Sequence, residues 1–127
     1  MNLKRASLAL LLLTGFMITS VAQAAKGAAT EADLDATIAL YRAEGAEKAL
    51  PEFERLHALF EKSNDRVNGA RAERYMGESH WRLGNYEQSR THLDEALGLT
   101  RELGQRLAEG KTLNVLGLLE WDLGNYE

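Results

Sequence analysis

The three histidines, His57, His80 and His92, are the side chains in this 127-residue chain best suited to acid–base or metal chemistry. His92 and Glu95 are three residues apart and would share one face of a helix. Two ligands do not complete a zinc site, which needs three or four from the protein. We therefore predict no metal site and expect surface or half-buried histidines.

The sequence lacks the other arrangements that catalysis commonly uses. It contains no cysteine, no HExxH pair, no glycine-rich phosphate loop and no Gly-x-Ser-x-Gly motif. We predict that these residues form no enzyme active site and hold no cofactor. Any function would then be binding, which depends on how helices present side chains.

Seven residues recur with one change after 40 positions: 81–87 reads WRLGNYE and 121–127 reads WDLGNYE. A period of this length is typical of solenoids, in which one helical unit cannot bury its apolar face alone and is copied along the chain. The second copy ends at Glu127, so we expect the repeat to be cut in mid-unit.

The first 24 residues have the pattern of a cleavable signal peptide. Lys4 and Arg5 precede an apolar run over 6–21, and residues 22–24 (AQA) have small side chains where a signal peptidase requires them. The alternative is a membrane anchor, but a span needs about 20 apolar residues and two threonines, a glycine and a serine interrupt this run. We predict export to the periplasm or secretion, with a flexible lead-in over 25–30.

Charge and cysteine content limit the partners. Cleavage would remove two of the 15 basic side chains, so that 13 face 19 acidic ones and the net charge is −6 with histidine neutral. This excess argues against nucleic acid or an anionic membrane as partner. Without cysteine, stability must come from packing alone.

Residues 31–127 are predicted to be helical throughout, because Ala, Leu, Glu and Arg dominate and there is one proline. We expect helices over 31–44, 46–63, 66–83, 86–103 and 105–123. The glycines that follow these stretches suit left-handed C-terminal caps: Gly45, Gly84, Gly104 and Gly124.

Helix starts are also marked in the sequence. Thr30 can cap the first helix with Asp33 in its first turn, and Asn85 with Gln88 can form a capping box for the fourth. Pro51 does not fit, because it falls in the second turn of the second helix. We expect that helix to start later or to bend there.

The repeated residues resemble those of the tetratricopeptide repeat (TPR) family, in a long form of about 40 residues per unit. The best-preserved unit, 66–104, has a Met-Gly pair, a Gly-Asn-Tyr turn and small residues on its second helix: Met76, Gly77, Gly84, Asn85, Tyr86, Ser89 and Ala96. The unit at 105–127 has Leu116, Gly117, Gly124, Asn125 and Tyr126. The unit at 31–65 lacks the Gly-x-Tyr turn but keeps Ala49 and Phe53.

This resemblance implies an all-α solenoid of antiparallel helix hairpins, about two and a half repeats long. Gly77 and Gly117 would let the two helices of a hairpin approach closely, with Ser89 and Ala96 small on the facing helix. Tyr86 would fill the gap between repeats. A larger residue at Gly77 should cost about 1 to 3 kcal/mol.

The resemblance also implies a concave face, lined by the first helix of each repeat, that holds an extended or helical peptide. Carried over by position, it points to six residues: Arg71, Arg74, Glu78, Lys111, Asn114 and Leu118. Their cationic and amide groups would hold carboxylates of the peptide. The alternative is a solvated helix face with ordinary charges.

Trp81 and Trp121 lie in the last turn of their helices, with Tyr41 at the equivalent place in the first unit. They could form a platform for a ligand. Packing between neighbouring repeats explains the same recurrence, and we favour it.

Three functions are compatible with these features. The first is an exported scaffold that binds a protein or peptide. The second is the N-terminal regulatory part of a longer protein. Exported bacterial proteins that this chain resembles often carry such repeats ahead of a caspase-like CHAT domain. The third is self-association through the last helix, where no following helix covers the apolar side chains: Leu113, Leu116, Trp121 and Leu123.

Overall fold

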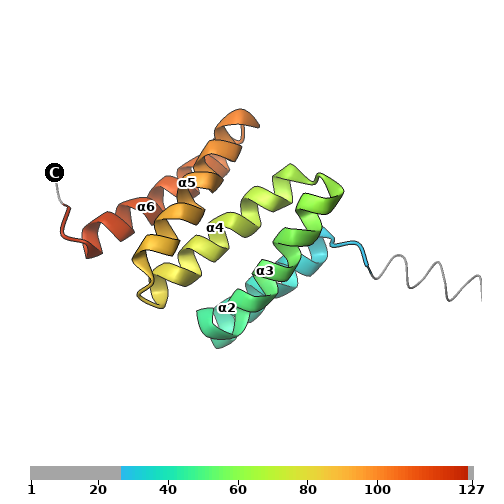
Figure 1. Cartoon of the computed structure of the whole chain (residues 1–127), viewed down its shortest axis with the longest axis horizontal. Coiled ribbons are helices and arrows are strands. Elements are labelled where there is room, and N and C mark those ends of the chain that lie inside the picture. The colour runs from blue at the N-terminus through green and yellow to red at the C-terminus, as the bar shows by residue number, and fades with distance from the viewer. Residues whose placement is uncertain (1–26, 126–127) are drawn as a thin grey trace, which may run out of the picture.

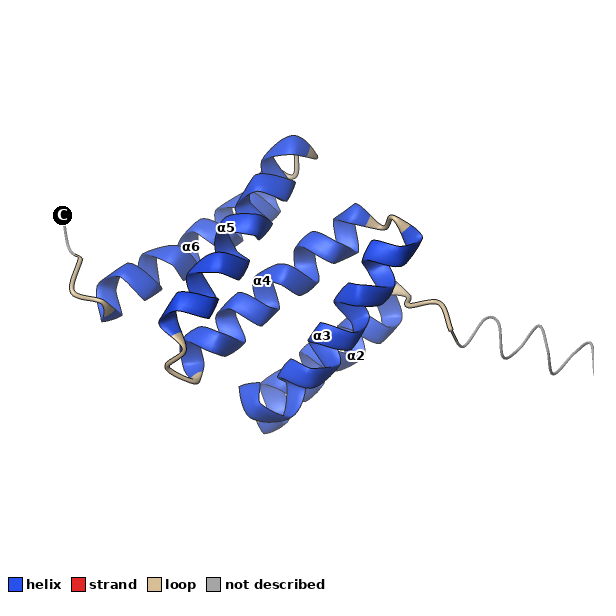
Figure 2. Cartoon of the chain, in the orientation of Figure 1, coloured by secondary structure: helices blue, strands red, loops and turns tan. Residues whose placement is uncertain are grey.

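The computed structural model describes residues 27–125, and all regular structure in that range is helical (Figures 1 and 2). The five helices are α2 (Glu31–Glu44), α3 (Ala46–Ser63), α4 (Arg66–Arg82), α5 (Tyr86–Glu102) and α6 (Arg106–Asp122). The predicted all-α repeat architecture agrees with these helices, whose bounds differ from the predicted ones by at most one residue. The predicted signal peptide at 1–24 and Tyr126 lie outside the described residues.

Successive helices pack against each other as antiparallel neighbours, with α2 and α3 at one end of the stack and α6 at the other (Figure 1). Alternate helices also touch, α2 with α4 and α4 with α6. A unit that contacts only its near neighbours is characteristic of a solenoid. No helix in the described range is long and apolar enough to cross a membrane.

The turns after α3, α4, α5 and α6 have one geometry. In each, a residue with positive φ follows the helix: Asn64 (57°), Gly84 (79°), Gly104 (66°) and Gly124 (77°). The next backbone N–H then donates to the carbonyl five residues back, as Asn85 does to His80 at 2.8 Å. These turns recur every 20 residues and confirm the glycine caps at Gly84, Gly104 and Gly124.

Two turns differ from the prediction. Gly45 has φ 93° and ψ 179°, a positive-φ conformation that glycine adopts readily but that is not left-handed helical, and this one residue joins α2 to α3. Asn64 takes the left-handed conformation without glycine, which asparagine tolerates better than most residues.

The predicted caps are confirmed at Thr30 and wrong at Asn85. The Thr30 hydroxyl accepts from the Asp33 N–H, and the Asp33 carboxylate accepts from the Thr30 N–H at 2.8 Å. That bonding lowers the pKa of Asp33. Asn85 precedes α5 but makes no capping bond, because its amide turns back to within 3.4 Å of His80 Nδ1.

Pro51 lies inside α3, which starts at Ala46, so the expectation of a later start is wrong. Its ring is exposed, and the helix goes without the one N–H that proline lacks. The flanking turns of α3 are held by buried side chains, including Ala49 and Phe53.

The core repeats with the 40-residue period. Phe53, Leu56 and Phe60 of α3 are fully buried, and the residues 40 positions later on α5, including Leu93 and Ala96, are equally buried. The second helix of each hairpin therefore faces the same way. An aromatic group reinforces the α2–α3–α4 end, where Phe53 stacks on Tyr75 with ring centres 5.2 Å apart and Tyr41 meets both rings edge-on.

Gly77 makes the predicted close approach. A Cβ built on it would lie 2.6 Å from Leu93 Cγ, and its carbonyl accepts from the buried Ser89 hydroxyl at 2.7 Å. The same role predicted for Gly117 is not seen, since no described atom beyond its chain neighbours and the backbone of its own helix lies within 4 Å of its Cβ position. Ser89 and Ala96, the small residues of the facing helix, are fully buried. Tyr86 packs beside the cluster of Leu93, Val115 and Leu119.

Candidate functional site

A groove runs between α4 and α6 and consists of two adjoining hollows, of about 140 Å³ and about 560 Å³. Arg74, Leu107 and Lys111 line both hollows, so the two form one continuous surface, which we call the α4–α6 groove. The 40-residue period explains its position, because equivalent faces of α4 and α6 lie side by side in the stack.

The groove brings together all six residues predicted to contact a peptide. The larger hollow is lined by five of them, Arg74, Glu78, Lys111, Asn114 and Leu118, and the smaller one by Arg71. Whether they contact a partner stays a prediction. The same surface includes residues that the sequence analysis did not assign to it: Trp81, Arg82, Arg106 and Leu107.

The cations on α4 already have carboxylate partners. Arg71 contacts Asp35 Oδ1 at 2.7 Å and Glu31 Oε1 at 3.0 Å. Arg74 lies over the Tyr75 ring, 4.2 Å from its centre, and 3.6 Å from Glu78. Both arginines are therefore largely neutralised by the protein itself.

Glu78 is the acidic centre of the groove. It accepts a 2.9 Å hydrogen bond from the Tyr41 hydroxyl and lies 3.5 Å from Arg82. Burial, and then the charge of Glu78, raise the pKa of Tyr41 far above its ordinary value, so Tyr41 remains a hydrogen-bond donor at all physiological pH. Arg82 also lies over the Tyr41 and Trp81 rings, at 5.5 Å from each centre.

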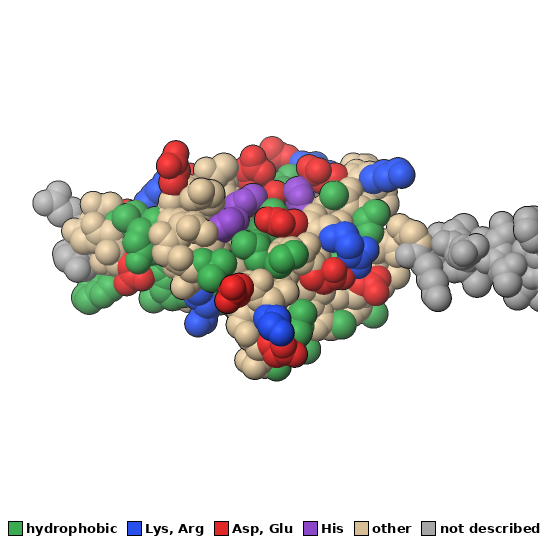
Figure 3. Space-filling model, turned by 60° about the horizontal axis from the view of Figure 1, so that its bottom comes forward, with side chains coloured by type: hydrophobic (Ala, Val, Ile, Leu, Met, Phe, Trp, Pro, Cys, Tyr) green, Lys and Arg blue, Asp and Glu red, His purple; other side chains and the backbone are tan. Residues whose placement is uncertain are grey.

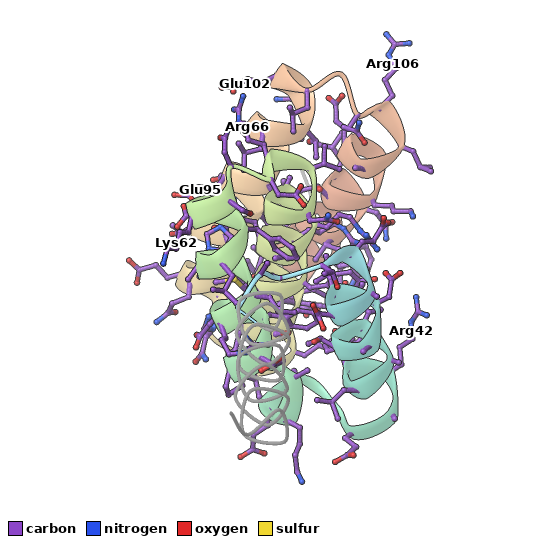
Figure 4. The ribbon with its side chains drawn as sticks, turned by 90° about the vertical axis from the view of Figure 1, so that its right-hand side faces the viewer. Arg42, Lys62, Arg66, Glu95, Glu102 and Arg106 are labelled. Carbon is purple, nitrogen blue, oxygen red and sulfur yellow. The ribbon has the colours of Figure 1, made fainter. Side chains whose placement is uncertain are left out.

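The cations on α6 differ from those on α4. Arg106 and Lys111 are exposed, and neither forms an ion pair within residues 27–125. Arg106 extends from the N-terminal end of α6 away from the other helices (Figure 4). The larger hollow thus has four basic side chains and one acidic one, with the uncompensated charge on α6.

Apolar side chains line the same hollow. Leu107 is 75% exposed and Leu118 is 42% exposed, and Trp81 is half-buried beside them. Trp81 also packs beside the Leu93 cluster and donates from Nε1 to Asp122 at 2.7 Å. Packing therefore accounts for Trp81, as we favoured, and Trp81 also lines the groove. Trp121 is 66% exposed, so burial between repeats does not account for it.

His92 shares a helix face with Glu95, but its ring contacts a carboxylate on a neighbouring helix. His92 contacts Glu73 at 2.7 Å rather than Glu95. Within the described range, no group of three or more His, Asp or Glu residues is arranged to hold a metal ion.

Comparison with known proteins gave one match. Residues 70–127 match the model of the tetratricopeptide repeat family, and this stretch contains α5, α6 and most of α4. Repeats of this family generally mediate protein–protein interactions and typically form non-catalytic scaffolds. No curated protein and no solved structure matched the chain.

Proposed function

We propose that this protein is an exported scaffold whose α4–α6 groove binds a protein or peptide partner with an acidic group next to Lys111. The observation that carries the proposal is the uncompensated charge of Lys111 and Arg106 beside exposed Leu107 and Leu118. A cation without an internal partner contributes its full attraction to a ligand, whereas Arg71 would first have to leave Asp35.

The size of the groove suits a short peptide segment of the partner rather than the surface of a folded domain. Its larger hollow of about 560 Å³ is within the range of pockets that enclose a few side chains. Apolar side chains of the partner would cover Leu118 and Leu107, and Asn114 would donate to its backbone. The charged and apolar parts of the groove therefore define an orientation for the partner.

Fluorescence titration tests this proposal, because Trp81 borders the groove and reports on its occupancy. The probes are a pool of short Asp- and Glu-rich peptides and a matched pool in which Lys replaces the acidic residues. We expect saturable binding of the acidic pool, weakened by salt. Lys111→Gln should weaken it by about ten- to a hundredfold, since a charged hydrogen bond contributes about 1.5 to 3 kcal/mol.

Lys62→Gln is the matched control, because Lys62 is also exposed but lies on α3, outside the groove (Figure 4). Asn114→Ala should also weaken binding, as should Arg74→Ala, although loss of Arg74 leaves Glu78 with one cation fewer. Equal affinities for both peptide pools, or binding unaffected by Lys111→Gln and Asn114→Ala, would remove the proposed site.

Export rests on the residues at 1–24 alone. Expression of the full chain in a bacterial host should give a periplasmic product whose N-terminus is Ala25. Intact mass and N-terminal sequencing of the fractionated product check this, and an uncleaved chain in the cytoplasm would contradict it.

Self-association is the second candidate role, and exposed apolar side chains on α6 favour it. Leu113, Leu118 and Trp121 are 43%, 42% and 66% exposed. Exposed apolar side chains favour an interface where they are contiguous. Light scattering should detect oligomers that Leu113→Lys dissociates, while a monomer at all concentrations would argue against this role.

A further inference from the structure

A buried carboxylate joins three helices on a part of the molecule that is separate from the groove. Glu73 of α4 is 2% exposed, and it lies between His57 of α3 and His92 of α5. Its Oε1 is 2.8 Å from His57 Nε2, and its Oε2 is 2.7 Å from His92 Nδ1. We call Glu73, His57 and His92 the histidine clasp. Histidine side chains reach the surface there among acidic neighbours (Figure 3).

Glu73 is not required by the repeat. The residue 40 positions later is Leu113, so an apolar side chain is compatible with this position of the first helix. A buried carboxylate is costly unless it is hydrogen-bonded or paired. Here both oxygens are satisfied, and both partners are imidazoles, whose charge changes near neutral pH.

The carboxylate itself stays ionised. Burial acts to raise the pKa of Glu73, but the hydrogen bonds from His57 and His92 outweigh it and lower the pKa to about 2. The protons that the clasp gains and loses near neutral pH are therefore on imidazole nitrogens.

The folded protein favours the protonated form of His57. The hydrogen bond to Glu73 raises the pKa of His57 above its ordinary 6.5, against the opposing effect of burial. Two further acids act in the same direction, Glu61 on α3 at 4.0 Å and Glu95 on α5. With one proton the clasp is electrically neutral, and without it a buried negative charge remains.

His80 lies against the histidine clasp. Its ring stacks on His92 with centres 5.3 Å apart and planes 2° from parallel. Burial, and then the nearby charge of His92, lower the pKa of His80, with Glu54 of α3 acting in the opposite direction. A cation on His80 would repel one on His92, so the clasp is strongest when His80 is neutral.

We propose that the histidine clasp is a proton-operated fastening that holds the α2–α3 hairpin more firmly to α4 and α5 at mildly acidic pH than at alkaline pH. Because His57 binds its proton more tightly in the folded protein, its stabilising contribution is complete below pH 6.5. That contribution is lost as the pH rises through the pKa that His57 has in the folded protein.

A looser contact between the α2–α3 hairpin and α4 would also affect the α4–α6 groove. The α2–α3 hairpin supplies Tyr41, which bonds Glu78, and Asp35, which neutralises Arg71. Both contacts cross from α2 to α4 and depend on how the hairpin is seated. The proton state of the clasp therefore biases the charge that α4 presents.

The test is hydrogen exchange of the whole chain, corrected for the intrinsic pH dependence of exchange, together with NMR titration of the histidines. We expect the protection of α2 and α3 amides to fall several-fold between pH 6 and pH 8.5, with α6 unaffected. The His57 resonance should titrate above 6.5.

His57→Gln should abolish this fall, because an amide keeps a donor to Glu73 but takes up no proton. Glu73→Gln should also abolish the fall in protection, and it should lower the pKa of His57 to 6.5 or below. Glu61→Gln, a surface change 4.0 Å from the same ring, should retain most of it. If His57 titrates at or below 6.5 in the wild type, or if His57→Gln keeps the full pH dependence, the clasp does not act as a proton-operated fastening.

Discussion

Gly77 and Gly117 are equivalent positions in the 40-residue repeat, and substitution of each by alanine should change stability in opposite directions. At Gly77 the new methyl group would lie 2.6 Å from Leu93 Cγ and 3.2 Å from Leu93 N. Leu93 is fully buried, so its side chain has little room to move, and its backbone cannot yield without shifting α5. At Gly117 nothing described lies within 4 Å.

The magnitudes follow from two opposing terms. Overpacking costs about 1 to 3 kcal/mol, and we expect the upper end because a backbone atom is among the close neighbours. Alanine in place of glycine within a helix gains about 1 kcal/mol. Gly77→Ala should therefore destabilise by about 2 kcal/mol, while Gly117→Ala should stabilise by about 1 kcal/mol.

Urea denaturation followed by circular dichroism at low protein concentration measures both variants. The difference of about 3 kcal/mol corresponds to roughly 10 to 25 °C between their midpoints of thermal unfolding. The slope of free energy against urea should match the wild type, so that the midpoints can be compared. A Gly77→Ala protein as stable as wild type, or two variants with the same change, would refute the close contact between α4 and α5.

Two other substitutions test single features by the same denaturation assay. Ser79 is fully buried and its hydroxyl has no hydrogen-bond partner among the described residues, so Ser79→Ala should stabilise the fold by about 1 kcal/mol. A loss of stability would show that the hydroxyl is bonded. Pro51 is exposed inside α3, so Pro51→Ala should restore a helical N–H bond and stabilise by about 1 kcal/mol. An unchanged midpoint would mean that α3 already accommodates the ring at no net cost.

The helices could be predicted closely because their ends are chemically marked. Gly84 and Gly104 end helices with a conformation that glycine adopts readily, and Thr30 starts one with a reciprocal cap. Asn64 was missed because asparagine has several roles at turns. Its place 20 residues before Gly84 was the signal that could have identified it.

The groove could be predicted in part because it follows from periodicity. Positions 40 residues apart meet on alternate helices, so Arg74 and Asn114 were brought to one surface without any knowledge of side-chain contacts. The pairing of Arg71 with Asp35 depends on how α2 sits on α4, which the spacing alone does not specify. For the same reason, Glu73 could be recognised as a partner of His57 only from the packed helices.

The four turns at 20-residue intervals make the chain sensitive to insertions in a particular way. Each of α4, α5 and α6 has 17 residues, about 25 Å of helix, and each ends in the same turn. One residue added inside α4 would rotate everything after it by about 100° and expose Leu93 and Leu119. Addition of a whole 40-residue unit would leave every register intact, so a change of length within α4, α5 or α6 keeps the packing only in complete steps.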